Sequence, residues 1–157
     1  MKSPIARTTL VLASSALLAT MIYAAQTGSS GDATHDQESA VGSIRSINTA
    51  ESYYAKEYGK GYSPTLAALG EAADGVKPSA DAASLLSHDL TNGTKANYVF
   101  TYTAGKPDTS AKIGTYTLSV RPLKWRPGMW NYFDDDSAII RGTKKNRAAT
   151  VSDPPLQ

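Results

Sequence analysis

The sequence predicts an α+β fold in which one long amphipathic helix near the N-terminus packs on a small antiparallel meander of about four strands. Apolar residues recur every three or four positions between residues 40 and 58, which is the period of a helix. Beyond Asn92 the apolar period falls to two, which is the period of a strand. A single sheet exposes an apolar face, and the long helix is the only predicted element large enough to cover it.

The first 25 residues have the three-part pattern of a signal peptide. Lys2 and Arg7 precede a stretch from Leu10 to Ala25 that carries no charge and ends in small residues. Its sixteen residues fall short of the roughly 20 that a membrane-spanning helix needs. We expect residues 1–25 to be cleaved, which leaves no stable membrane span, and the protein to be periplasmic or extracellular. Retention of the segment as an anchor is the alternative.

The long helix is expected to begin after a flexible linker. Residues 26–33 are rich in Gly and Ser and read as that linker. Thr34 and Gln37 fit a capping box, so we expect the helix to begin at Thr34, and Gly59 is its natural end. The apolar pattern inside it is interrupted at Glu51. Its core-facing positions are Ala40, Val41, Ile44, Ile47, Tyr54 and Tyr58.

The segment after the long helix carries weaker signals. Residues 63–70 contain a cap residue, a Pro and a terminal Gly, and so predict a helix of two turns. Residues 71–83 read as loop, and residues 83–90 as a further turn of helix.

The C-terminal half predicts the strands of the sheet. The expected strands are residues 97–103, 113–120, 130–133 and 138–141. The domain is then expected to span residues 34–142. Residues 143–157 hold several Lys and Arg, a Pro pair and almost nothing apolar, so they predict a disordered tail.

Composition excludes several classes of function. The chain has 157 residues and no cysteine, which excludes disulfides, thiolate nucleophiles and metal sites built on cysteine. Its sixteen Lys and Arg face fourteen Asp and Glu, and without Lys2 and Arg7 the charge is zero. Nucleic-acid binding needs a clustered excess of positive charge, so we expect no nucleic-acid partner. The remaining charge is divided: residues 26–120 are net acidic and residues 121–157 net basic.

Three successive carboxylates form a candidate metal site. Asp134, Asp135 and Asp136 offer the oxygen ligands that calcium prefers. They lack the spacing of a dedicated calcium loop, so a solvated hairpin turn is the favoured interpretation. No other cofactor is expected.

Aromatic and basic residues at the start of the third strand and in the segment before it form a candidate contact surface. Trp125, Arg126 and Trp130 are the residues that we expect to touch a partner, because aromatic rings stack on sugars and on protein surfaces. A catalytic alternative is carried by Ser87 and His88, which are the residue types of a nucleophile and its base. Nothing around them resembles an oxyanion motif, so a non-catalytic loop is favoured.

Part of the sequence resembles the globular domains of type IV pilin-like and type II secretion pseudopilin proteins. The most specific part is the run SAVGSIRSINTAE at residues 39–51, followed by Tyr53-Tyr54 and by GYSPTLAALG at residues 61–70. The similarity continues in residues 92–102 and 131–141. It implies a long helix packed on a small antiparallel sheet. We expect the chain to lack the usual prepilin leader and N-terminal core helix of the family, because residues 10–25 contain no glutamate and no Gly-Phe processing site.

Two classes of function follow from these observations. The first is an exported, non-catalytic pilin-like interaction protein, an accessory or minor component associated with a type IV pilus or type II secretion system, whose proteins would be its partners. The second is an independent secreted module that binds a glycan or a protein through the region of Trp125 and Trp130. The resemblance favours the first class, and the absence of a recognisable catalytic set is expected for both.

Overall fold

The computed structural model describes the backbone of residues 15–156 and the side chains of residues 32–156. Much of the predicted signal peptide, residues 1–14, lies outside the described residues. The chain divides into two compact units, Met1–Thr34 and His35–Gln157. Helix α1 spans Ser15–Tyr58 and therefore belongs to both.

The predicted linker is wrong, because residues 26–33 are helical and α1 does not begin at Thr34. Glycine costs only about 1 kcal/mol relative to alanine inside a helix. Nucleating a helix is much harder than extending one, so a short run of weak helix formers is bridged by helix on either side. The Gly and Ser content of this run was therefore a poor guide to its conformation.

The C-terminal unit contains the predicted antiparallel sheet, with five strands instead of four. The strands follow one another in space as they do in sequence, in the order β1-β2-β3-β4-β5. All neighbouring strands are antiparallel. Their bounds are β1 Thr94–Lys95, β2 Tyr98–Ala104, β3 Tyr116–Pro122, β4 Asn131–Asp135 and β5 Arg141–Thr143.

Strands β3 and β5 begin later than predicted, because the backbone groups of the preceding residues form hydrogen bonds outside the sheet. Strand β3 begins at Tyr116 because Ile113 pairs with the turn after α1: Tyr62 N donates to Ile113 O at 2.8 Å. A Cβ on Gly61 would lie 2.1 Å from that carbonyl oxygen, so the close approach requires glycine. Strand β5 begins at Arg141 because residues 135–138 form the hairpin turn, in which Ala138 N donates to Asp135 O at 2.8 Å.

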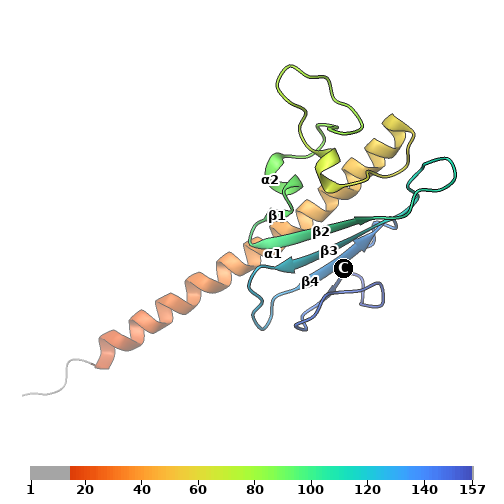
Figure 1. Cartoon of the computed structure of the whole chain (residues 1–157). Helices are drawn as coiled ribbons and strands as arrows, with labels where there is room; N and C mark the ends of the chain where they lie inside the picture. Colours follow the sequence, from red (N-terminus) through yellow and green to blue (C-terminus); the bar gives the residue numbers. More distant parts are fainter. Residues whose placement is uncertain (1–14, 157) are drawn as a thin grey trace, which may run out of the picture. The chain divides into compact units, whose positions relative to one another are not determined.

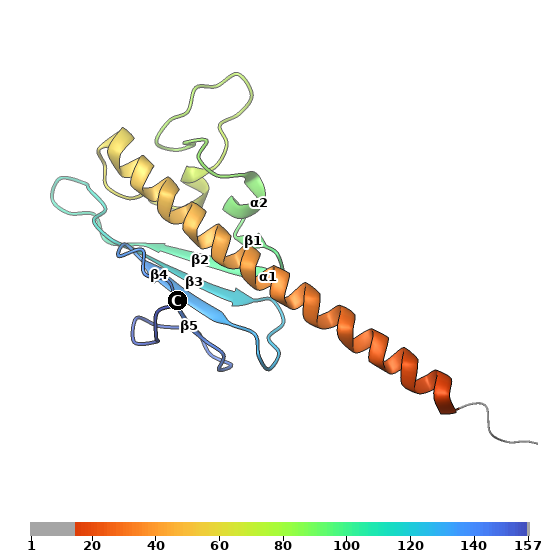
Figure 2. The same ribbon diagram turned by 180° about the vertical axis from the view of Figure 1, so that it is seen from behind.

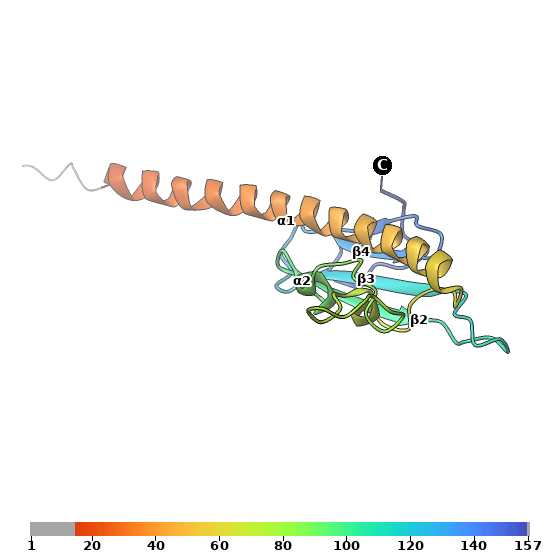
Figure 3. The same cartoon turned by 90° about the horizontal axis from the view of Figure 1, so that it is seen from above.

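Within the C-terminal unit, the second half of α1 crosses one face of β2, β3 and β4 (Figures 1 and 2). Seen from above, this part of the helix lies over the strands as a second layer (Figure 3). Four of the six predicted core positions of the helix, Ala40, Ile44, Ile47 and Tyr54, are buried in one core with Leu118 and Val120 of the sheet, whereas Val41 and Tyr58 are partly buried at its edge. The expected helix-on-sheet architecture is therefore confirmed.

The segment between α1 and the sheet is less helical than predicted. Residues 63–70 form only the 3-10 turn η1, Leu66–Leu69, where the hydroxyl of Thr65 accepts a hydrogen bond from Ala68 N at 3.2 Å. Residues 83–90 contribute only to α2, His88–Thr91. Ser84 has a φ of +53°, which is incompatible with a right-handed helix, so the residues around it cannot form the predicted helical turn.

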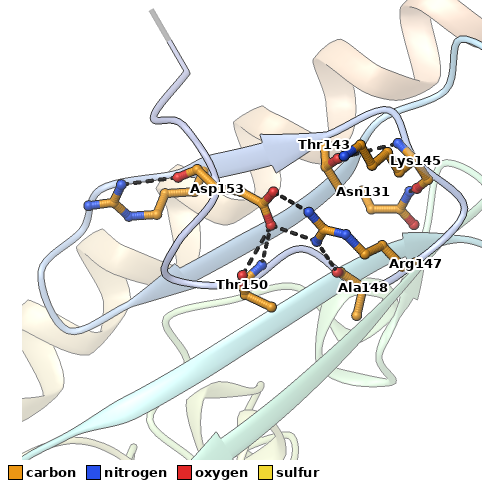
Figure 4. Close-up of polar contacts among 8 residues, drawn as sticks. Asn131, Thr143, Lys145, Arg147, Ala148, Thr150 and Asp153 are labelled. Atoms are coloured by element: carbon orange, nitrogen blue, oxygen red, sulfur yellow. Dashed lines mark hydrogen bonds and ion pairs between the residues drawn. The ribbon is translucent and has the colours of Figure 1, made fainter.

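The tail predicted to be disordered is folded against the sheet. Gly142 N donates to Pro154 O at 3.1 Å, and Leu156 N donates to Ile140 O at 2.8 Å. Asp153 is buried and receives two hydrogen bonds from Arg147, as Figure 4 shows. This bidentate pair holds the pKa of Asp153 well below its usual range. One ion pair and the contact of Leu156 thus order a segment whose composition alone suggested disorder.

We predict that Asp153→Asn loosens the C-terminal segment, because the guanidinium of Arg147 loses its anionic partner. Trypsin should then cleave after Lys144, Lys145 or Arg147 several-fold faster than in the unchanged chain. Limited proteolysis followed by intact-mass analysis measures this rate. Asp136→Asn, at an exposed acid in the hairpin turn, is the control. Equal cleavage rates in all three chains would contradict the role assigned to the ion pair.

Candidate functional site

A buried carboxylate lies where α1 faces the sheet. Glu51 occupies a core position of α1 and is 0% exposed. Ser63 provides both of its hydrogen-bond donors: the backbone N–H donates to Oε2 at 2.8 Å and the hydroxyl to Oε1 at 2.5 Å. The interruption of the apolar pattern at Glu51 is therefore a buried polar contact between the helix and the turn that follows it.

Tyrosines from the sheet surround this contact. Tyr102 of β2 donates its hydroxyl hydrogen to Ser63 O at 2.9 Å. Its ring stacks on Tyr116 of β3 with centroids 5.5 Å apart, and Tyr116 donates to Asn48 Oδ1 of α1 at 2.8 Å. Burial raises the pKa of both phenols far above the usual range, so both remain protonated donors.

A second buried carboxylate, that of Asp134 in β4, lies on the same interface but accepts no hydrogen bonds of the kind that Glu51 receives from Ser63. It is 0% exposed, and neither carboxylate oxygen has a direct hydrogen-bond partner. Burial raises its pKa to about 7; the negative charge of Asp135 adds to this, and the amide of Asn48 opposes it. The interface therefore contains one carboxylate fixed by donors and one whose charge depends on pH near neutrality.

This polar interface is closed to substrates. Ser63 and Glu51 are a hydroxyl and a carboxylate in direct contact, but both are 0% exposed. Their geometry ties the end of α1 to the sheet, and a substrate has no path to the hydroxyl oxygen.

The predicted calcium site is not formed. Asp134 faces the interior, whereas Asp136 is exposed in the turn. Asp135 instead accepts hydrogen bonds from the backbone N–H of Ser137 at 3.0 Å and from its hydroxyl at 2.5 Å. Alternation along a strand sends successive side chains to opposite faces, so three adjacent aspartates cannot converge there. Within the described part of the chain, no group of three acidic or histidine side chains is placed to hold a metal ion.

The predicted contact residues are placed around the end of the sheet. Trp125 is half-buried and packs against the core, and its Nε1 is buried without a partner. Trp130 is also half-buried, and Lys144 Nζ lies 4.9 Å from the centroid of its ring. Arg126 is exposed. The two tryptophans therefore contribute mainly to packing, and Lys144 occupies part of the ring surface on which a sugar would stack.

The residues of the catalytic alternative are not arranged for chemistry. Ser87 is the N-cap residue of α2, and its side chain makes no capping hydrogen bond. His88 is exposed in the first turn of that helix. Across the described residues, no hydrogen bond links this hydroxyl to this imidazole.

The concave feature that sequence reasoning missed is a groove along the outer side of α1. It has a volume of about 440 Å³. From α1 it is lined by Arg45, Ser46, Thr49, Ala50 and Tyr53, and from the segment before α2 by Leu85 and Leu86. Arg45, Thr49 and Tyr53 recur every four residues, which places them on one helix face. Tyr53 is 56% exposed, whereas Tyr54 is buried. The signal available in the sequence was that Tyr53 lies outside the apolar period to which Tyr54 belongs.

Comparisons with protein families, with characterised proteins and with solved structures found no match to this chain. None of the helices in its described part combines the length and the apolar character that crossing a membrane requires.

We predict that Asp134 makes stability fall as pH rises through neutrality. Its pKa is raised to about 7, so the folded state holds a proton that the unfolded state, with a carboxyl pKa of about 4, releases between these values. The free energy of unfolding should therefore decrease by up to about 1.4 kcal/mol per pH unit across that window. Urea unfolding at pH 5 and pH 8 measures the difference.

Asp134→Asn should remove this fall and be more stable than the unchanged chain at pH 8, while Asp136→Asn should retain it. A fall of equal size in Asp134→Asn would show that another group is responsible.

We predict that Glu51→Gln destabilises the fold although the side chain keeps its size. The amide nitrogen cannot accept a hydrogen bond, so Ser63 loses one of its two hydrogen bonds to a charged acceptor, and its hydroxyl must turn to the neutral Thr65 O, 3.0 Å away. The expected loss is about 1–3 kcal/mol in the free energy of unfolding. Urea denaturation measures it, with Glu57→Gln, an exposed acid on the same helix, as the control. Equal stability of the two variants would contradict the role of Glu51.

Proposed function

We propose that this protein is an exported, non-catalytic pilin-like interaction protein, an accessory or minor component associated with a type IV pilus or type II secretion system. The observation that carries the proposal is the packing of α1 across one face of an antiparallel sheet, which is the architecture that the resemblance of residues 39–51 implies. This helix-on-sheet packing supports the proposal, because it is the arrangement that the proposal requires.

The arrangement of polar groups supports an interaction role over chemistry. Glu51, Ser63 and Asp134 are enclosed between helix and sheet, where they act on stability. The groove beside Tyr53 is lined by apolar side chains, hydroxyls and one guanidinium, a set suited to contact with another protein.

The proposal predicts that the protein, immunoprecipitated after chemical crosslinking in its native host, brings down pilus or secretion-system proteins. Its deletion should impair pilus function or secretion, and the unchanged gene should restore it. N-terminal sequencing of the exported protein tests the predicted cleavage, with a start near Ala25 or Gln26 expected. The proposal would be contradicted if pilus function and secretion were both normal in the deletion strain and no pilus or secretion-system protein were recovered by immunoprecipitation.

A further inference from the structure

We propose that the groove lined by α1, Leu85 and Leu86 binds a short apolar segment of a partner protein that carries a carboxylate. The inference rests on the proposed interaction function and assigns to it a surface and a chemistry. The argument depends on the length of the groove, its apolar floor, the rigidity of its wall and the charge at one end.

The groove has the length of a short peptide. Arg45 and Tyr53 are eight residues apart on α1, which corresponds to roughly 12 Å at 1.5 Å per residue. An extended chain covers that distance with roughly three or four residues. The volume of about 440 Å³ falls within the range of about 300–1,000 Å³ typical of ligand pockets.

The floor of the groove is apolar and already belongs to the core. Ala50 is 4% exposed and Leu86 is 8% exposed, and Leu85 is half-buried beside them. Tyr53 stands at one end with 56% of its surface exposed. Tyrosine and arginine are enriched among the residues that contribute most to protein interfaces, because they combine a large contact area with polar atoms.

The wall of the groove opposite α1, formed by Leu85 and Leu86, is held in place by hydrogen bonds within the protein itself. The backbone N–H groups of Leu85 and Leu86 both donate to Leu69 O at 2.9 Å. Ser84 N donates to Gly70 O at 2.7 Å. A wall held by backbone hydrogen bonds loses little conformational entropy on binding, which favours affinity for a short segment.

Arg45 gives the groove its charge preference. It is the one charged residue among the seven lining residues, and the single ion pair found in the described part of the chain is elsewhere, between Arg147 and Asp153. The residues three and four positions away on α1 are uncharged, so the helix offers the guanidinium no carboxylate. They are Val41, Gly42, Asn48 and Thr49.

The two aliphatic hydroxyl groups of the helix face do not compete with Arg45 for an anion. The hydroxyl groups of Ser46 and Thr49 donate their hydrogens to Gly42 O and Arg45 O, each at 3.0 Å. The guanidinium is therefore the strong anion donor of the groove, and it matches a carboxylate with two parallel hydrogen bonds. One cation over an apolar floor fits an acidic, apolar peptide better than a polyanion, which needs several cations.

Selection of peptides on the purified full-length protein tests the proposal. A display library of random heptapeptides is panned against the immobilised chain, and selected sequences are synthesised with a fluorescent label for anisotropy titrations. We expect apolar residues around one Asp or Glu, and at least tenfold weaker binding when that acid is replaced by its amide. Arg45→Gln should abolish the difference between acid and amide peptides, and Tyr53→Ser should weaken both.

Lys106→Gln, which changes an exposed cation in the loop between β2 and β3, is the control and should bind as the unchanged chain does. All three changes are at exposed positions, and urea unfolding verifies that each variant is folded. Selected peptides without an acid, or affinities that Arg45→Gln and Tyr53→Ser leave unchanged, would overturn the assignment of the groove.

The experiments can reject the groove assignment and the proposed function independently of each other. If no acidic peptide is selected while the unchanged protein still recovers pilus or secretion proteins, the groove assignment is wrong and the proposed function stands. If acidic peptides bind in the groove but no such proteins are recovered, the proposed function is wrong and the groove assignment stands.

Discussion

The contact between Glu51 and Ser63 is the constraint on which the arrangement of helix and sheet depends. A carboxylate in an apolar interface is costly unless donors replace its water. Here both donors come from one residue, so the chain leaving α1 must place Ser63 at a single position. The backbone carbonyl oxygen of Ser63 also accepts a hydrogen bond from the hydroxyl of Tyr102, which connects Ser63 to β2. Helix, turn and sheet are therefore held in register by one buried side chain.

Asp134 shows what the same interface does to a carboxylate without such donors. Its burial matches that of Glu51, but its oxygens have no direct partner and its pKa is raised to about 7. The phenol of Tyr116, which lies close by, donates to Asn48 instead. One layer of the fold thus contains a carboxylate that accepts two hydrogen bonds from Ser63 and a carboxyl group whose pKa is raised by burial. The outer side of α1, where Arg45 and Tyr53 are exposed, is free of this constraint and is available for contact with a partner.

The sequence was informative where the pattern is local and uninformative where distant residues decide. Periodicity was enough to predict the buried side of α1 and the alternation of the central strands. The linker was mispredicted because extending a helix through Gly and Ser costs less than their composition suggests. The tail was mispredicted because its order depends on one ion pair with Asp153 and on Leu156. The groove could not be predicted because Leu85 and Leu86 are placed beside α1 by hydrogen bonds to Leu69.

Amide hydrogen exchange at Ser63 tests the central claim most directly. Ser63 lies in an irregular segment, where an amide that faces water exchanges through small local openings. Because its N–H donates to the buried Glu51, we predict that it exchanges as slowly as the amides of β3, through openings close in free energy to global unfolding. Exchange of Ser63 at the rate of the exposed residues Ala73, Asp74 and Gly75 would contradict the account.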